Sequence, residues 1–245
     1  TFLLGFLTDS IEYLWYYQGV LLVLFFHHSH TLIKYTRFYP VKKHRQRHKS
    51  SDQLHFISAN VYQFNKEYEK FTGLVKKHNP DFFMTMESNG DWEKAMRPLE
   101  KEYSYQHKVT LENTYGMHFY SRIEIKEAKT HYFVADDIPS IEVHMKTADG
   151  FSFVFFGVHP PPPSPTEEET SKERDGDLLS TAKCVKDIKK PVIVVGDFNN
   201  VAWSRSSVLF RKTSHLIDPR IGHSFVSTFH AKYRLLRFPI DLMFH

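Results

Sequence analysis

The chain has 245 residues, of which 41% are hydrophobic and 24% charged, so it is long enough to bury a core and its composition does not indicate disorder. The net charge of +4 is mild, which permits a phosphate-bearing partner without demanding one. The single cysteine, Cys184, excludes an internal disulfide and a zinc site built from cysteines. It lies in a helical pattern, which favours a packing role.

An apolar run lies near the N-terminus, and a basic cluster follows it. Residues 11–26 are apolar except for Glu12 and Gln18, carry Tyr and Trp at one end, and are slightly shorter than the roughly 20 residues that span a bilayer. We expect residues 1–40 to anchor the chain in a membrane as a hydrophobic helix, and residues 41–53 to form a basic linker that keeps the following domain in the cytoplasm. A buried or interfacial helix is the alternative.

A strand, a helix and a second strand come next. Residues 54–62 predict a buried strand with Asn60 near its end, residues 65–79 a helix that stops before a proline, and residues 81–86 an apolar strand followed by Glu87. Such a unit makes its two strands parallel. Asn60 and Glu87 should therefore emerge at the same edge of one sheet.

The middle of the chain adds antiparallel strands. Residues 92–103 predict a short helix and residues 113–122 a strand. Residues 140–147 and 151–158 flank an Asp-Gly turn, which predicts a hairpin whose second strand ends at His159. Parallel and antiparallel pairs should therefore occur together.

The most informative stretch is the β-branched run of residues 192–195, which follows Pro191, stops at Gly196 and is followed by a loop with Asp197 and Asn199. It fits a buried strand better than a helix. The Asp-x-Asn spacing places a carboxylate and an amide on one side of an extended segment, at a strand end where ligands bind. A loop with an Asx-turn is the other interpretation.

Further elements surround this run. They are a helix over residues 166–188 in which Gly176 offers a break, a short helix over 204–212, and strands over 224–229 and 238–245, the last carrying Asp241.

Polar residues lie at or beside most of the predicted strand ends: Asn60, Glu87, His159, Asp197, Asn199 and Asp241. Together they suit one hard divalent ion and one phosphate group, because carboxylates with few nitrogen ligands favour Mg²⁺ or Mn²⁺. Glu87 is the expected metal ligand. Taken singly, each residue has an ordinary explanation, such as a solvated loop acid or a hydrogen-bonded edge histidine.

The order of these segments resembles the endonuclease/exonuclease/phosphatase superfamily from about Leu54 onward. The matching pieces are Ser58-Ala59-Asn60, residues 81–87, Gly157-Val158-His159-Pro160, Gly196-Asp197-Phe198-Asn199 and Pro239-Ile240-Asp241. Residues 113–117, 121–122 and 136–140 look like the bacterial membrane-anchored branch. The resemblance implies an α/β fold over residues 54–245, a four-layer sandwich of two mixed β-sheets flanked by helices.

The resemblance also implies metal-dependent hydrolysis of a phosphoester, most plausibly by a nuclease-like phosphodiesterase. Carried onto this sequence, it makes Glu87 the metal ligand with support from Asn60, and Asp197 the group that positions or deprotonates the attacking water. His159 and Asn199 would hold the phosphate oxygens, and Tyr115 is a weaker candidate for a substrate contact. Nucleic acid, phospholipid and phosphorylated small molecules all remain open as substrates.

Family members end with a strand and an Asp-His pair whose histidine contacts the scissile phosphate and is oriented by an upstream acid, here Asp241. This sequence stops four residues after Asp241, and His245 is too near to be that histidine. We therefore expect a C-terminal truncation that removes the last strand and leaves low activity. The alternatives are a non-catalytic membrane-linked binding module of the same fold, and a membrane-associated interaction protein that uses the basic linker and the proline run.

Overall fold

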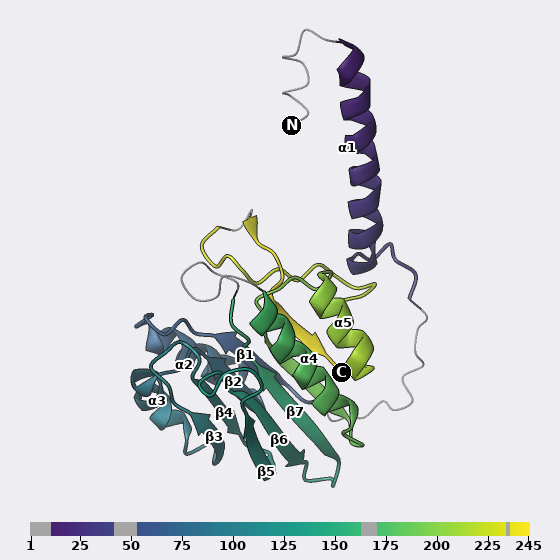
Figure 1. The fold of residues 1–245 in the computed structure, drawn as a ribbon. Coiled ribbons are helices and arrows are strands. Elements are labelled where there is room, and N and C mark those ends of the chain that lie inside the picture. The colour runs from purple at the N-terminus through teal and green to yellow at the C-terminus, as the bar shows by residue number, and fades with distance from the viewer. Residues whose placement is uncertain (1–10, 42–52, 163–170, 234–235) are drawn as a thin grey trace. The chain divides into compact units, whose positions relative to one another are not determined.

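The structure, a computed structural model, describes residues 11–41, 53–162, 171–233 and 236–245. They fall into two units: the described residues within 1–44 together with 220–225, and the described residues within 45–219 together with 226–245. In chain order (Figure 1) the elements are α1 (Ile11–Leu32), η2 (Ile33–Tyr35), β1 (Phe56–Asn60), α2 (Tyr68–His78), β2 (Phe82–Met86), α3 (Gly90–Met96), η3 (Arg97–Leu99), β3 (Tyr105–Val109), β4 (Met117–Ser121), β5 (Glu124–His131), β6 (Ser140–Lys146), β7 (Ser152–Val158), α4 (Lys172–Lys186), β8 (Val192–Asp197), α5 (Arg205–Ser214) and β9 (Asp241–Phe244).

The second unit contains two mixed β-sheets. The first has the order β1-β2-β4-β3, in which β1 and β2 are parallel and the other pairs antiparallel. The second has the order β5-β6-β7-β8-β9, in which β7 and β8 are the parallel pair. Both the β1-α2-β2 unit and the β6-β7 hairpin predicted from the sequence are present. Each parallel pair brings two strand ends to one edge, and this property builds the site described below.

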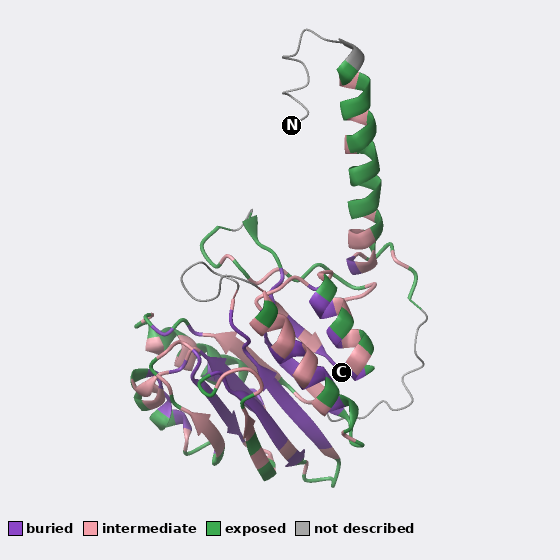
Figure 2. Cartoon of the chain, in the orientation of Figure 1, coloured by how far each residue is buried: buried purple, intermediate pink, exposed green. Residues whose placement is uncertain are grey.

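Alternating side chains on β2 separate two cores. Phe82 and Met84 face the second sheet and pack with Phe119, Ile141, Val143, Phe155 and other apolar side chains in a buried cluster. Phe83 points the other way, toward α2 and α3, where it packs with Val75, Trp92 and Tyr120 among others. The inner strands β2, β4, β6, β7 and β8 are accordingly the most buried part of this unit, whereas β1, β3 and β5 are partly exposed (Figure 2). One helix layer thus covers the first sheet, and the two sheets share a dry interface.

Helices α4 and α5 form the other outer layer, on the far side of the second sheet from α2 and α3 (Figure 1). Three fully buried aromatic rings pack this helix layer against the second sheet. They belong to Phe198, Phe210 of α5 and Phe244 of β9, and their ring centroids lie 5.1–5.3 Å apart. The order is therefore helices, sheet, sheet, helices. This confirms the predicted sandwich of two mixed sheets flanked by helices.

Several details differ from the sequence prediction. Strands β3 and β5 were not expected, because their sequences are mostly polar and give no clear alternation; β5 also carries a register shift between Ile125 and Glu127. Helix α4 continues through Gly176 without a break. Residues 224–229 form no strand, only an isolated bridge from Phe229 to Phe238. The predicted start of α4 near Thr166 lies outside the described residues.

The first unit contains the 22-residue helix α1, with exposed aromatic side chains such as Trp15 at 70%. Among the described residues, no helix combines the length and apolarity needed to cross a bilayer. The membrane-spanning segment expected over residues 11–26 is therefore not supported. Gln18 interrupts the apolar run, and the helix continues into the polar sequence of residues 27–31, which lowers its mean hydropathy. The expected linker falls largely in residues 42–52, outside the described residues, and stays a prediction.

A buried acid in α4 gives the first prediction. Asp177 has no exposed surface, neither carboxylate oxygen has a hydrogen-bond partner among the described residues, and burial raises its pKa from 3.8 to about 7. The folded state then holds a proton that the unfolded state releases, so the free energy of unfolding should fall as pH rises from about 4 to about 7. D177N should remove this slope and stabilise the protein at pH 8 by on the order of 2–4 kcal/mol.

Urea denaturation at several pH values measures this slope. D136N, at an exposed position, is the matched control and should keep the wild-type pH dependence. Equal slopes for D177N and the wild type would show that folding does not raise the pKa of Asp177, which would contradict this prediction.

Candidate active site

The side-chain amide of Asn60 lies between two carboxylates from different sheets. Its Nδ2 donates to Glu87 Oε1 at 2.7 Å and to Asp197 Oδ2 at 3.3 Å. Its Oδ1 accepts from the backbone N–H of Tyr62 at 3.0 Å, which fixes which end of the amide faces the acids. Asn60 ends β1 and pairs with Met86, the last residue of β2, so Glu87 follows directly at the same edge. The amide therefore joins the ends of both sheets.

Glu87 is held from two sides. Oε1 accepts from Asn60, and Oε2 accepts from the backbone N–H of Gln63 at 3.3 Å. The backbone of Glu87 has φ 58°, in the left-handed region that is uncommon for a residue with a long side chain. Such conformations persist where the surroundings over-determine them and gather at functional sites. The carboxylate therefore has a fixed direction at the end of β2.

Asp197 and Asn199 form a compact turn after β8. The backbone N–H of Asn199 donates to Asp197 Oδ1 at 2.9 Å, and Asn199 has φ 46°. This is the Asx-turn that the sequence offered as an alternative, and it positions both groups. Gly196 is required just before it, because a Cβ there would lie 1.8 Å from the carbonyl oxygen of Val158 on β7.

Asp241 faces Asp197 across the β8–β9 pair, in direct register. Burial, together with the negative charge of Asp197, raises the pKa of Asp241 from 3.8 to about 6. Thr228 Oγ1 accepts from the backbone N–H of Asp241 at 3.2 Å. Two acids thus share one edge, and Asp241 loses its proton about two pH units higher than an ordinary aspartic acid does.

His159 and Tyr115 complete the set. His159 directly follows Val158, which pairs with Gly196, so His159 and Asp197 leave adjacent parallel strands. The His159 ring is 5.5 Å from the Tyr115 ring, and its buried Nδ1 has no hydrogen-bond partner among the described residues. Asn199 Nδ2 donates to the carbonyl oxygen of Pro160 at 2.9 Å, which ties the two loops together.

The residues present fit a hard divalent cation. Glu87, Asp197 and Asp241 gather at one edge, and within the described part of the chain none of them forms an ion pair with Lys or Arg. Carboxylate oxygens are the donors that Mg²⁺ and Mn²⁺ prefer, and Glu87, held by Asn60, offers such a donor. Among the described residues, the carboxylate oxygens of these three acids do not all lie within 4.8 Å of one another, so a cation here would not be bound by all three directly. All seven residues singled out in the sequence are linked in this region, while their metal and catalytic roles stay predictions.

Two residues that support the candidate site were not predicted from the sequence. The buried side chain of Gln63 donates from Nε2 to the carbonyl oxygen of Glu112 and accepts at Oε1 from the backbone N–H of Thr114. These two hydrogen bonds fix the loop that leads to Tyr115. Met86 is also involved, because its sulfur accepts from the backbone N–H of Asp197 at 3.2 Å. A lone glutamine and a strand methionine carry no chemical signature, so only the fold reveals these positions.

Comparison with solved structures supports the fold. Zebrafish (D. rerio) TDP2 in complex with a single-strand DNA product is similar with a TM-score of 0.64 at 13% identity, covering 78% of this chain and 82% of that one. A β toxin variant from Staphylococcus aureus with bound magnesium ions gives 0.62 at 19% identity, covering 79% and 83%. A mannosyl-6-phosphatase from Bacteroides thetaiotaomicron gives 0.60 at 20%, covering 78% and 85%.

No match was found among curated proteins. A family model, in contrast, matches residues 57–245, which include every residue of the candidate site and all strands of both sheets except Phe56, the first residue of β1. This chain is therefore a member of the endonuclease/exonuclease/phosphatase family.

Proposed function

We propose that this chain is a divalent-metal-dependent phosphoester hydrolase, and more narrowly a nuclease-like phosphodiesterase. Family membership supports phosphoester hydrolysis in general. The observation that carries metal-dependent hydrolysis at this site is the Asn60 amide, which holds Glu87 and Asp197 at its two N–H groups. Hydrolysis of a phosphoester needs a carboxylate that binds the metal and a base that activates water, held at a fixed distance from each other. Similarity to TDP2, which was solved with a single-strand DNA product, favours the narrower, nuclease-like activity.

Each residue has a task in this proposal. Glu87, supported by Asn60, would hold Mg²⁺, which when bound stabilises negative charge on the phosphoryl oxygens. Asp197 accepts one hydrogen bond at each oxygen and keeps lone pairs with which to orient or deprotonate a water. One side-chain N–H of Asn199 donates to the carbonyl oxygen of Pro160, so the other N–H is left to donate to a phosphate oxygen. His159 adds a donor beside it.

The neighbours guide the choice of substrate and cofactor to test. TDP2 was solved with a single-strand DNA product, and the β toxin variant with magnesium ions. Single-stranded DNA with Mg²⁺ or Mn²⁺ is therefore the first assay condition, with a phospholipid and a sugar phosphate as the second and third. Tyr115, which packs against His159, is proposed as a contact for the substrate.

The second prediction concerns Asp197 and Glu87. D197N keeps the shape of the side chain and removes the base, so kcat should fall roughly 10²–10⁴-fold. E87Q should instead raise the Mg²⁺ concentration needed for half-maximal activity. Phosphodiester cleavage is measured at several Mg²⁺ concentrations. Because Asp91 and Glu67 are exposed and paired only with nearby lysines, D91N and E67Q are matched controls that should behave as wild type.

These measurements can overturn the proposal. It fails if the folded wild-type protein, assayed with its native C-terminal sequence restored, shows no metal-dependent cleavage of any of the three substrates. It also fails if D197N, folded as judged by circular dichroism, retains wild-type kcat.

The third prediction concerns the proton on Asp241. Burial is the larger cause of its raised pKa and the charge of Asp197 the next, so D197N should lower the pKa of Asp241 below 6 without restoring 3.8. In metal-free protein, ¹³C NMR of labelled aspartate carboxyls reports this titration. D91N is again the control. An Asp241 pKa that does not change in D197N would show that the two carboxyls do not interact.

We also propose that α1 attaches the chain to the interfacial region of a membrane, with the catalytic domain on the cytoplasmic side. Exposed aromatic side chains support this, including Tyr13, Trp15, Tyr16 and Tyr17, since Trp and Tyr favour the membrane–water interface. The basic residues after the helix would contact anionic headgroups.

The fourth prediction tests this attachment by co-sedimentation with phosphatidylserine-containing vesicles. Replacing Trp15, Tyr16 and Tyr17 together by Ser should move the chain from the pellet to the supernatant. Replacing the exposed Tyr132 and Phe151 by Ser is the control and should leave it in the pellet. Equal sedimentation of the two variants would contradict the proposal.

A further inference from the structure

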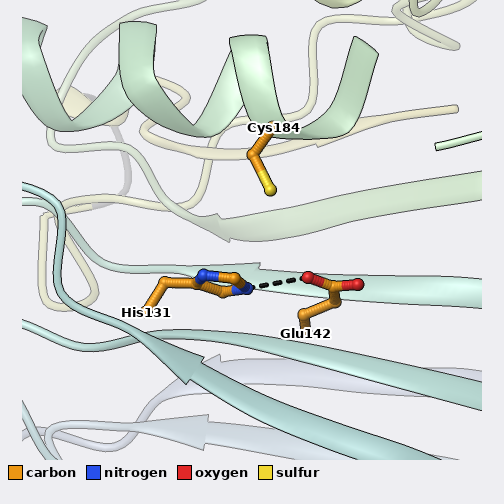
Figure 3. A group of neighbouring side chains, drawn as sticks. All are labelled: His131, Glu142 and Cys184. Atoms are coloured by element: carbon orange, nitrogen blue, oxygen red, sulfur yellow. Dashed lines mark hydrogen bonds and ion pairs between the residues drawn. The ribbon is translucent and has the colours of Figure 1, made fainter. Parts of the chain in front are cut away.

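A second group of potential metal ligands lies away from the candidate active site. His131 at the end of β5, Glu142 of β6 and Cys184 of α4 each offer one ligand atom, and these three atoms all lie within 4.8 Å of one another (Figure 3). His131 Nε2 and Glu142 Oε2 are 2.7 Å apart. Figure 3 shows the Cys184 thiol directed from the helix toward the two strand residues.

The fold explains why these residues meet. Ile141 and Val143 of β6 point into the core between the sheets, so Glu142, which alternates with them, points to the opposite face. His131 reaches that face from β5, where Lys129 is the register partner of Glu142. Helix α4 supplies Cys184 from above this face. Three separate elements thus direct a nitrogen, an oxygen and a sulfur to one point.

We propose that His131, Glu142 and Cys184 bind a zinc ion. An imidazole, a carboxylate and a thiolate are all accepted zinc ligands, whereas Mg²⁺ prefers oxygen alone. One thiolate and one carboxylate balance the two charges of Zn²⁺ and the imidazole is neutral, which suits a partly buried position. Tetrahedral zinc places its ligand atoms roughly 3.3–3.6 Å apart, so side-chain shifts of about 1 Å complete the geometry.

His144 gives the carboxylate a fixed orientation. It lies two residues from Glu142 on the same face of β6, and its Nε2 hydrogen bonds to Oε1, the oxygen that does not contact His131. Carboxylates that ligate metals are commonly held in this way by an outer partner. His144 therefore acts as a positioning residue for the zinc ligand.

The layer between α4 and this sheet contains further buried polar atoms without partners among the described residues. They are Ser140 Oγ on β6, both carboxylate oxygens of Asp177, and Thr181 Oγ1. Asp177, Thr181 and Cys184 are spaced i, i+4 and i+7 and so share one face of α4. Buried polar atoms in proteins are normally satisfied by water or an ion.

The composition of the chain makes the test unambiguous. Because Cys184 is the only cysteine, any thiolate-to-metal charge transfer must come from this position. The full chain is stripped of metal with a chelator and titrated with Co²⁺, which replaces zinc and absorbs visibly in tetrahedral sites. We expect a charge-transfer band and tetrahedral d–d bands that saturate at one equivalent, and that C184A abolishes the charge-transfer band.

Zinc affinity, measured by competition with a chromophoric chelator, gives the second readout. C184A and H131A should weaken it at least tenfold, and H144A by roughly 10–100-fold. H78A, at an exposed histidine, is the matched control. E87Q should leave the thiolate-to-cobalt charge-transfer band unchanged, so failure of this site and failure of the active-site proposal are distinguishable.

The result that would overturn the proposal needs no variant. A folded wild-type chain that shows no thiolate charge-transfer band at saturating Co²⁺ has no metal bound to Cys184. Equal zinc affinity of folded C184A and wild type would lead to the same conclusion. In either case Glu142 is simply a buried carboxylate paired with two histidines.

Discussion

The contact of the Asn60 amide with Glu87 and Asp197 is the interaction on which the candidate active site depends. Asn60 and Glu87 belong to the first sheet and Asp197 to the second, so the amide fixes the edge of one sheet against the edge of the other. An amide suits this position because its two N–H groups can satisfy two acids while its oxygen accepts a backbone N–H. Without it, two partly buried carboxylates would repel each other.

The sandwich makes this contact possible. Each sheet has one parallel pair, β1–β2 and β7–β8, and each pair ends at the same side of the molecule. The apolar face of both sheets is used to pack them together, so the strands have little freedom to slide. The site therefore inherits its geometry from the core, and the loops add only the last few residues. Many folds carry different chemistries in this way, with a constant core and functional residues that differ between proteins.

Apolar periodicity predicted the buried strands well. The β-branched run of β8 and the apolar run of β2 both predicted buried strands, and the polar residue at each strand end could be located from them. Strands β3 and β5 were missed because they lie at sheet edges, where polar residues on one face remove the alternation. Gln63 and Met86 were missed because their contacts depend on distant segments. Cys184 was assigned to packing, since the sequence alone does not show that His131 and Glu142 lie beneath it.

The left-handed backbone of Glu87 and Asn199 bears on how this protein can evolve. Neither residue is glycine, yet both have positive φ, so glycine would fit each backbone with less strain. Replacing either residue by glycine would relieve backbone strain but would also remove a side chain of the candidate site. Stability gained at this edge of the sandwich would therefore come with the loss of those polar groups.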